Sequence, residues 1–253
     1  MSLDLSPAPG AAPPVRRVLA YAGLELRQQL RNGEQLLLTL VIPVGALVLF
    51  ATVPVLRHGA DRVDALTPGI MALAVMSTAF TGQAIATGFE RRYGALKRMG
   101  ATPLGRGGLL AGKTLAVLAV ELLQLAVICG VAAGLGWRPR GDVAVVVLLL
   151  VLGTATFSGF GLLLAGTLRA EATLATANLV YVVLLVVGGI VLPLRTFPHG
   201  LATALRALPV NALAEGLRAV LETGAGFPFT DVLVLAAWAA AGLLLASRTF
   251  RWE

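Results

Sequence analysis

Six long apolar runs dominate this sequence and constrain its fold more than any other feature. An α-helix needs about 20 residues to cross the hydrocarbon core of a bilayer. Each run reaches that length within a few residues, and each is continuous, whereas the strands of an outer-membrane barrel would be shorter and would alternate between apolar and polar residues. The sequence therefore predicts an all-α integral membrane protein with six transmembrane helices, over residues 36–56, 66–89, 109–135, 143–168, 172–194 and 229–246.

The composition excludes several other classes of protein. Only 13% of the 253 residues are charged, about half the fraction in an ordinary soluble domain, so a soluble enzyme, a disordered chain and a secreted disulfide scaffold are all excluded. The net charge is +7, but the basic residues lie between apolar runs, where lipid head groups and topology explain them better than a nucleic acid does. One cysteine, Cys129, and two distant histidines, His58 and His199, predict neither a disulfide nor a metal site.

The basic residues predict the orientation of the chain in the membrane. An even number of spans places both termini on one side. Thirteen of the 20 Lys and Arg residues then fall in the terminal segments and in the second and fourth loops, and the other seven fall on the opposite side. Because Lys and Arg accumulate on the cytoplasmic side, we expect a multi-pass protein of the cell membrane with both termini in the cytoplasm.

The whole chain divides into a short N-terminal tail and one transmembrane domain. Residues 1–14 contain four prolines and are expected to form a disordered tail, whereas residues 15–253 are expected to form a single transmembrane domain. Within the latter, Val15–Arg31 carries apolar residues on one helical face and basic and polar residues on the other. This pattern is typical of a helix that lies in the membrane interface, although a solvated start of the first span would also fit.

The segment 195–228 is too polar and too rich in proline to cross the membrane. Two short helices are expected in it, over 200–208 and 212–222, with Asn211 as the cap of the second. A long loop without secondary structure is uncommon. We therefore favour a helical hairpin that is half inserted from the outer side, and an ordinary external loop is the alternative.

The second loop, residues 90–106, is the main cytoplasmic feature of the predicted topology. Gly94 and Gly100 bracket a short charged helix in it. Thr102 and Pro103 fit a helix cap followed by the first residue of the next helix. The sequence therefore predicts a short helix that lies across the membrane surface between two spans. The alternative is a plain loop, but a plain loop would need only to be soluble and would not require this pattern.

A nucleotide-binding motif is matched at Gly107–Thr114, which fits G-x-x-x-x-G-K-[ST]. A working motif of this kind follows a buried strand and opens a soluble helix. Here a basic loop precedes the match and a transmembrane span follows it. We therefore expect no nucleotide to bind, and we expect Lys113 to snorkel from the cytoplasmic end of the third span.

Polar residues at membrane depth are candidates for a substrate path. Glu121 lies 12 residues into the third span, where a carboxylate must be paired, protonated or wetted. Its role stays open between lining the substrate path and forming a structural hydrogen bond to a neighbouring helix, and Gln124 and Gln83 are its expected neighbours in depth. The same span contains the small-residue pairs Gly108/Gly112 and Gly130/Gly134, which either permit close helix packing or reflect a glycine-rich composition.

The loop and the hairpin together resemble those of the membrane subunits of type-2 ATP-binding-cassette exporters. The loop reads Glu90-Arg91-Arg92-Tyr93-Gly94-Ala95-Leu96 and ends in Thr102-Pro103, and the hairpin region contains Leu192-Pro193-Leu194, Phe197-Pro198, Leu208-Pro209 and Gly216-Leu217-Arg218. The resemblance covers nearly all of the chain after Val15. It implies a six-span permease in which the second loop is a coupling helix docked on an ATPase.

The resemblance also implies partners and site residues. The ATPase would be a separate subunit that holds ATP and Mg²⁺, while this chain would bind no cofactor and catalyse no reaction. The working unit would contain a second membrane subunit, most simply a second copy, and would export a drug-like, lipid or other amphiphilic substrate. The coupling role would fall on Glu90, Arg91, Arg92, Gly94, Ala95, Leu96, Lys97 and Met99, and the hairpin would contribute Pro209, Glu215 and Arg218.

Two other classes of function are weaker alternatives. An intramembrane enzyme needs a nucleophile with its base, or a carboxylate cluster, at membrane depth, and both histidines fall in expected external loops. A transporter driven by an ion gradient would favour inverted repeats with broken helices, which the sequence lacks, although Glu121 keeps this alternative open.

Overall fold

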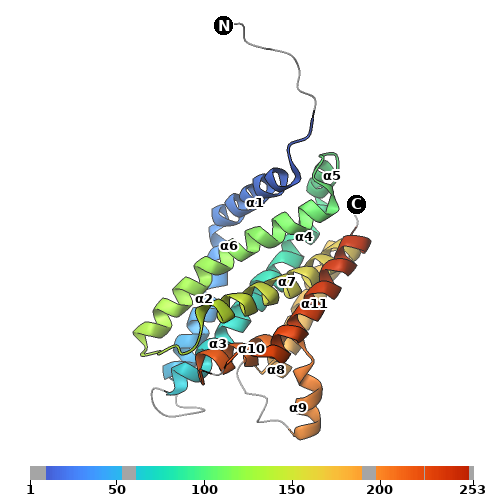
Figure 1. Ribbon diagram of the computed structural model, residues 1–253. Helices are drawn as coiled ribbons and strands as arrows, with labels where there is room; N and C mark the ends of the chain where they lie inside the picture. Colours follow the sequence, from blue (N-terminus) through green and yellow to red (C-terminus); the bar gives the residue numbers. More distant parts are fainter. Residues whose placement is uncertain (1–9, 53–60, 190–197, 225, 251–253) are drawn as a thin grey trace, which may run out of the picture.

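The computed structural model describes residues 10–52, 61–189, 198–224 and 226–250. These residues form helices and no strand, so the predicted all-α class is confirmed (Figure 1). The expected disordered tail lies mostly outside the described residues. The described helices are α1 (Pro14–Arg31), α2 (Gly33–Thr52), α3 (Asp61–Val75), the π-helix η1 (Met76–Gly82), α4 (Gln83–Arg92), α5 (Ala95–Gly100), α6 (Gly105–Gly134), α7 (Val143–Thr167), α8 (Ala170–Val187), α9 (His199–Arg206), α10 (Pro209–Leu221) and α11 (Phe229–Thr249).

Five of the predicted spans correspond to helices that are long and apolar enough to cross a bilayer, within the part of the chain that is described. They are the continuous helix α3–η1–α4, and α6, α7, α8 and α11. The sixth candidate, α2, has a shorter apolar part, Thr39–Thr52. The expected end of that span, 53–56, lies outside the described residues, as do residues 190–194 of the expected fifth span. The structure therefore supports a multi-pass helical membrane protein without confirming the number six.

The second span differs from its prediction in two ways. The helix begins at Asp61 instead of residue 66, and its middle turns form the π-helix η1. Such segments insert an extra residue into an α-helix and are frequent at functional sites. Gly161 of α7 packs against η1 so closely that a Cβ atom there would lie 2.8 Å from the carbonyl oxygen of Phe80, so α7 holds the irregular backbone in place.

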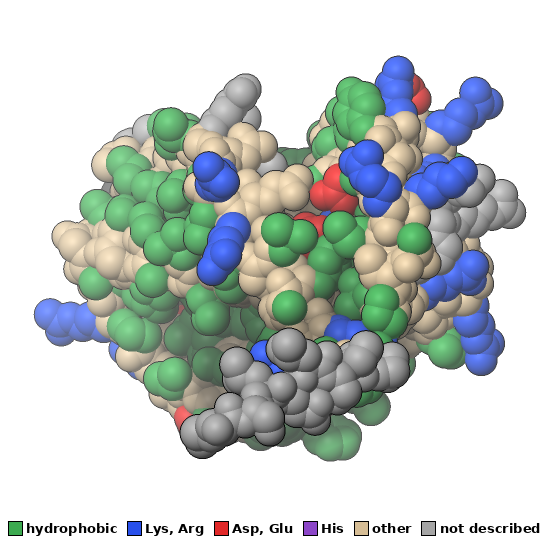
Figure 2. Space-filling model, turned by 90° about the horizontal axis from the view of Figure 1, so that it is seen from above, with side chains coloured by type: hydrophobic (Ala, Val, Ile, Leu, Met, Phe, Trp, Pro, Cys, Tyr) green, Lys and Arg blue, Asp and Glu red, His purple; other side chains and the backbone are tan. Residues whose placement is uncertain are grey.

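The two short helical regions lie at opposite ends of the bundle (Figure 1). Helix α5 lies at the end where α1 begins and α11 finishes, and α9 and α10 lie at the other end. The described helical ends of the chain are therefore on one side of the bundle. Figure 2 views the α5 end and shows Lys and Arg side chains spread over it, with acidic side chains in its hollowed centre.

The predicted hairpin contains both expected helices, but its second helix is buried more completely than its apolar face required. Leu213, Leu217 and Val220 are buried as the helical pattern predicts, and so is Arg218, because α10 packs against α3, α7 and α11. The prediction that Asn211 caps this helix is wrong. Asn211 lies inside α10, and its amide nitrogen donates to the carbonyl oxygens of Leu205 and Val187, which ties α10 to α9 and α8.

Two hydrophobic cores hold the bundle together. The larger core lies between α3, η1, α6, α7 and α10. The smaller core lies at the α5 end and brings together side chains from α1, α5, α6, α7 and α11, namely Tyr21, Leu96, Leu109, Leu110, Leu162, Ala246 and Phe250. This second core is the structural link between the short helix α5 and the long helices.

The small-residue pairs of α6 have different environments. A Cβ atom at Gly112 would lie 2.5 Å from Cδ1 of Tyr21, so this glycine permits α1 to approach α6 closely. Close packing is therefore confirmed for the first pair. A Cβ atom at Gly130 or Gly134 would meet nothing within 4 Å among the described atoms, so the second pair makes no close packing within this chain.

Candidate functional site

The short helix that was predicted between Gly94 and Gly100 is present as α5, and glycine determines where it begins. Gly94 adopts a left-handed conformation with φ of 71°, which glycine reaches without the steric cost that other residues pay. Leu96 is fully buried in the smaller core, whereas Lys97 and Arg98 are exposed. The helix is therefore anchored on one side and presents basic side chains on the other.

The prediction for the segment after α5 is wrong in one respect. Thr102 does not cap α6, which begins at Gly105. The hydroxyl of Thr102 donates instead to the carbonyl oxygen of Met99 at 2.6 Å. Thr102 therefore closes the end of α5, and the next helix begins two residues later than Pro103.

The arginines before α5 connect the end of α4 to the start of α8. Arg91 donates to the carbonyl oxygen of Leu168, and Arg92 forms an ion pair with Glu171. Exposed ion pairs contribute about 0–1 kcal/mol, so Arg92 and Glu171 position the two helix ends more than they stabilise the fold. A cavity of about 470 Å³ lies beside these residues and is lined mainly by basic side chains, those of Arg91, Arg92, Lys97 and Arg169, together with Glu171.

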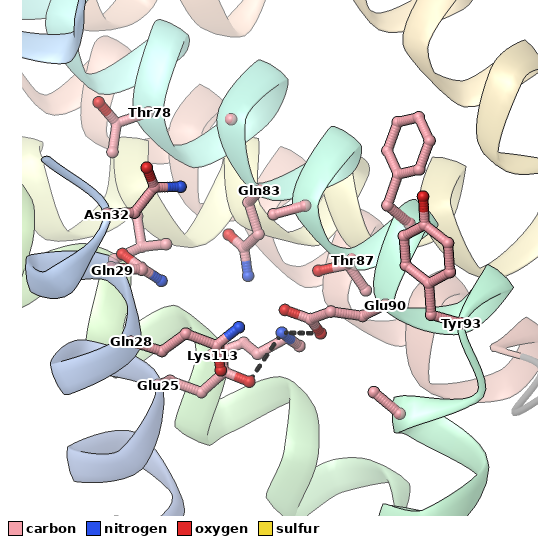
Figure 3. Close-up of a pocket in the computed structure, with 15 residues that line it drawn as sticks. Glu25, Gln28, Gln29, Asn32, Thr78, Gln83, Thr87, Glu90, Tyr93 and Lys113 are labelled. Atoms are coloured by element: carbon pink, nitrogen blue, oxygen red, sulfur yellow. Dashed lines mark hydrogen bonds and ion pairs between the residues drawn. The ribbon is translucent and has the colours of Figure 1, made fainter. Parts of the chain in front are cut away.

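Glu90 belongs to a buried cluster of charges. The Nζ atom of Lys113 on α6 lies 2.7 Å from Oε2 of Glu90 on α4 and 2.9 Å from Oε1 of Glu25 on α1 (Figure 3). The hydroxyl of Tyr21 also donates to Glu25, and burial together with the Glu25 carboxylate raises the pKa of Tyr21. Three helices that are distant in sequence therefore meet through one ammonium group.

This cluster was not predicted, and its position contradicts the expectation for Lys113. Lys113 does not snorkel, because its side chain is only 3% exposed. The helical pattern of Val15–Arg31 places Glu25 on the polar face of α1, and in the structure this face is turned toward α6 at Glu25. The available signal was Gly112, since a glycine next to Lys113 permits a helix to approach that position.

The same contacts explain why the nucleotide-binding match has a structural role. Lys113 is engaged by two carboxyl groups. The next residue of the motif, Thr114, donates to the carbonyl oxygen of Leu110 and lies 2.7 Å from the hydroxyl of Ser158. In this arrangement both functional side chains of the motif bond to groups of the protein itself.

The three residues predicted to line a substrate path do not lie in one place. Gln83 is hydrogen-bonded to Ser158 and lines a pocket at the α5 end. Gln124 donates to the carbonyl oxygen of Thr39 at 2.7 Å and accepts from Thr78. Because Pro43 has no N–H group to donate to Thr39, Gln124 satisfies a carbonyl that the proline leaves free.

Glu121 is buried against a neighbouring helix of the same chain. The hydroxyl of Thr154 on α7 bonds to Oε2 of Glu121, and Thr154 also lies 2.8 Å from the carbonyl oxygen of Leu150. A hydroxyl has one hydrogen to donate, so a neutral Glu121 that donates its own proton would satisfy both contacts. This geometry fits the structural role that the sequence left open.

The predicted hairpin residues lie at the other end of the bundle. Pro209 occupies the first turn of α10, where a proline costs no hydrogen bond. Glu215 and Arg218 form an ion pair of 2.8 Å one turn apart. They are far along the bundle from α5, so the structure does not combine the hairpin and the coupling segment into one site.

The pocket that Gln83 lines has a volume of about 390 Å³ and lies between α1, α4 and α6. The charge cluster forms part of its wall, and Tyr93 after α4 and Ala95 at the start of α5 also line it. In Figure 3, Gln83, Thr87 and Glu90 point toward the same space from one side, and Gln28 and Gln29 lie on the opposite side. Neither Glu121 nor Gln124 lines it.

Comparison with known proteins identifies the family. The family model described as "ABC-2 type transporter" matches residues 17–221. This chain belongs to the ABC-2 type transporter family. The match begins within α1 and ends with α10, so it includes the coupling segment, the charge cluster and the hairpin. The chain is therefore the membrane component of an ABC transporter, a permease, as the sequence resemblance indicated.

A curated relative supports the same assignment. The permease is 25% identical over 182 residues to the protein named ABC transporter G family member 20 of Dictyostelium discoideum. The aligned region covers 70% of this chain but only 25% of the relative. The permease thus corresponds to about a quarter of the length of that larger protein.

Proposed function

We propose that this permease is a subunit of an exporter that moves an amphiphilic substrate out of the cytoplasm, driven by ATP hydrolysis on a separate subunit. The observation that carries the proposal is the construction of α5. This helix exposes Lys97 and Arg98 while Leu96 anchors it in the smaller core. Such a helix can receive a push from a partner and pass it inward.

Contacts in the smaller core would transmit a movement of α5 to the long helices. Leu96 lies in one cluster with Tyr21 of α1, Leu109 and Leu110 of α6, Leu162 of α7 and Phe250 at the end of α11. Well-packed cores transmit displacement because they contain few voids. A movement of α5 would therefore reach at least four long helices at once.

The ATPase would dock on the face formed by α5 and the basic cavity beside it. Arg91, Arg92, Lys97 and Arg169 line that cavity and outnumber its one acidic residue, Glu171. A surface of this charge favours an acidic partner surface. ATP and Mg²⁺ would be held by that partner, and Lys113 would act in packing α1 on α6.

The assembly would contain two copies of the permease, with the α5 ends in the cytoplasm of the cell and the hairpin end outside. The large apolar side chains exposed on α2 and α8, such as Leu49, Leu179 and Val186, require lipid or a second permease around them. The basic residues of the α5 end favour the cytoplasmic orientation.

The proposal is tested by isolating the permease with its partner. The tagged full chain is purified from its own cells, and the preparation is assayed for a co-purifying ATPase and, in inverted vesicles, for ATP-dependent uptake of an amphiphilic dye. Leu96→Ala should abolish most uptake while the ATPase still associates. Leu205→Ala is the matched control, since Leu205 is a buried leucine of the short helix α9 at the other end. Normal uptake by Leu96→Ala, or the lack of any associated ATPase, would refute the proposal.

A further inference from the structure

The pocket between α1, α4 and α6 contains buried polar groups that have no partner. Gln83 is 5% exposed and Thr87 is 1% exposed. Nε2 of Gln83 and Oγ1 of Thr87 make no hydrogen bond with any described residue, although both residues line the pocket. A buried polar atom without a partner costs about 1–3 kcal/mol, so these two atoms indicate a position where a bound group supplies the missing hydrogen bonds.

The charge of the pocket favours a cation. Its wall contains two carboxyl groups, Glu25 and Glu90, and one ammonium group, Lys113. When both carboxyl groups are ionised, the cluster has one negative charge in excess. Figure 3 shows that Gln83, Thr87 and Glu90 converge on the same space. A ligand ammonium group next to Glu90 would balance the charge, and a ligand hydroxyl group would reach the unpartnered amide and hydroxyl.

The rest of the lining fits an apolar chain attached to that head group. Ala86, Phe89 and Val117 form apolar parts of the wall. The lining residues on the α1 side are polar, so these apolar residues of α4 and α6 form the part of the wall that would contact the chain of an amphiphile. A molecule with its polar end in the pocket would therefore keep its tail in an apolar environment.

We propose that this pocket binds the head group of an amphiphile that carries both an ammonium group and hydroxyl groups, an amino-alcohol lipid or a molecule of the same chemistry. This inference rests on the proposed export function, because the amphiphile that it names would be the exported substrate. The pocket is lined by Tyr93, which follows α4, and by Ala95, the first residue of α5, so a bound head group would lie next to the helix that would couple transport to the ATPase.

The test measures binding to the full chain without an ATPase. A fluorescent bimane label on Tyr93→Cys, in a Cys129→Ala background, reports on the pocket in nanodiscs of phosphatidylcholine. Sphinganine with a 12-carbon chain should produce a saturable change in the bimane fluorescence. Dodecylamine, which has no hydroxyl, should bind more weakly, and dodecanoate should produce no saturable change. Serinol, the amino-alcohol head group without a chain, should not displace the sphinganine at comparable concentration.

Matched variants locate the binding. Thr87→Val should weaken sphinganine binding about tenfold, which corresponds to the loss of about one hydrogen bond to the ligand hydroxyl, and Thr87→Ser should restore it. Thr81→Val is the control, because its hydroxyl is also unpartnered among the described residues but does not line the pocket. Equal thermal unfolding of the two valine variants shows that both are folded.

The outcomes separate this inference from the proposed function. Equal binding by Thr87→Val and Thr81→Val, equal binding of dodecanoate, or full displacement by serinol would overturn the assigned site. Lack of binding together with intact ATP-dependent transport would overturn the inference alone. Specific binding, together with the recovery of no ATPase when the tagged permease is purified from its own cells, would support the site and contradict the export proposal.

Discussion

Lys113 and Glu90 lie 23 residues apart in sequence, and their charged atoms are 2.7 Å apart in the structure. The contact joins the end of α4 to the first half of α6, the two long helices that precede and follow the short helix α5 in sequence. Glu25 of α1 pairs with the same ammonium group, so this cluster, the ionic junction, joins α1, α4 and α6 next to α5. A displacement of α5 would therefore act on helices that these ion pairs hold together.

The first prediction concerns the stability of this junction. Lys113→Gln leaves two buried carboxyl groups without their cation, and we expect it to lower the free energy of unfolding by about 3–5 kcal/mol, as breaking a buried ion pair does. The measurement is thermal unfolding of the purified full chain in detergent. Lys97→Gln is the matched control, since Lys97 is exposed. Equal unfolding of the two variants would show that the cluster does not stabilise the fold.

The second prediction concerns nucleotide. The purified permease alone should bind no ATP at the Gly107–Thr114 match, because Lys113 and Thr114 are both engaged within the protein. Equilibrium binding of labelled ATP to the parent and to Lys113→Arg, which keeps the charge, provides the measurement. Stoichiometric binding by the parent that the arginine variant loses would contradict this interpretation.

Local signals in the sequence were sufficient to predict that the short helices exist, but not always where they begin. Gly94 marks the start of α5 because its backbone preference acts locally, whereas α10 begins at Pro209 and not at the expected residue 212. The junction of Glu25, Glu90 and Lys113 could not be read in this way. It depends on how α1 packs along α6, a tertiary contact that helical periodicity does not define.

The hydrogen bond of Gln124 shows a signal that was present but unused. Pro43 lies inside α2 and has no N–H group to donate to the carbonyl oxygen of Thr39. A polar side chain of a neighbouring helix is one way to satisfy such a carbonyl in an apolar environment, and Gln124 donates to it. The π-helix η1 had no comparable local signal, because the packing of Gly161 against its backbone comes from a distant helix.

The third prediction concerns docking of the ATPase. Reversing two exposed charges, Lys97→Glu with Arg169→Glu, should weaken association with the ATPase about two- to tenfold, the range expected for two exposed charge pairs. The measurement is the amount of ATPase recovered with the tagged permease at low salt. Arg138→Glu with Arg140→Glu is the matched control, since these exposed arginines follow the far end of α6. Equal recovery with both pairs would contradict docking at the α5 face.

The fourth prediction concerns orientation. In a Cys129→Ala background, Gly200→Cys should react with a membrane-impermeant maleimide in intact cells, and Arg98→Cys should react only after the cells are opened. Both positions are exposed, so accessibility within the protein is matched. The reason is the accumulation of basic residues at the α5 end. Labelling of position 98 but not of position 200 in intact cells would invert the proposed topology.

The fifth prediction concerns Glu121, for which the structure favours a hydrogen bond to Thr154 over a role in charge recognition. Glu121→Gln keeps the shape and the hydrogen-bonding capacity of the side chain, so transport and unfolding temperature should both stay close to those of the parent. Thr154→Val removes the partner and should lower the free energy of unfolding by about 1–3 kcal/mol, because it leaves a buried carboxyl group unsatisfied.

Thr167→Val is the matched control for that substitution, since Thr167 is on the same helix and its hydroxyl, among the described residues, bonds to carbonyl oxygens of its own preceding turn, those of Leu163 and Leu164. It should unfold like the parent. The role of Glu121 is decided by comparing transport by Glu121→Gln with the unfolding temperature of the same variant. If Glu121→Gln abolishes transport while its unfolding is unchanged, the carboxyl charge itself acts on the substrate, and the structural interpretation of Glu121 is wrong.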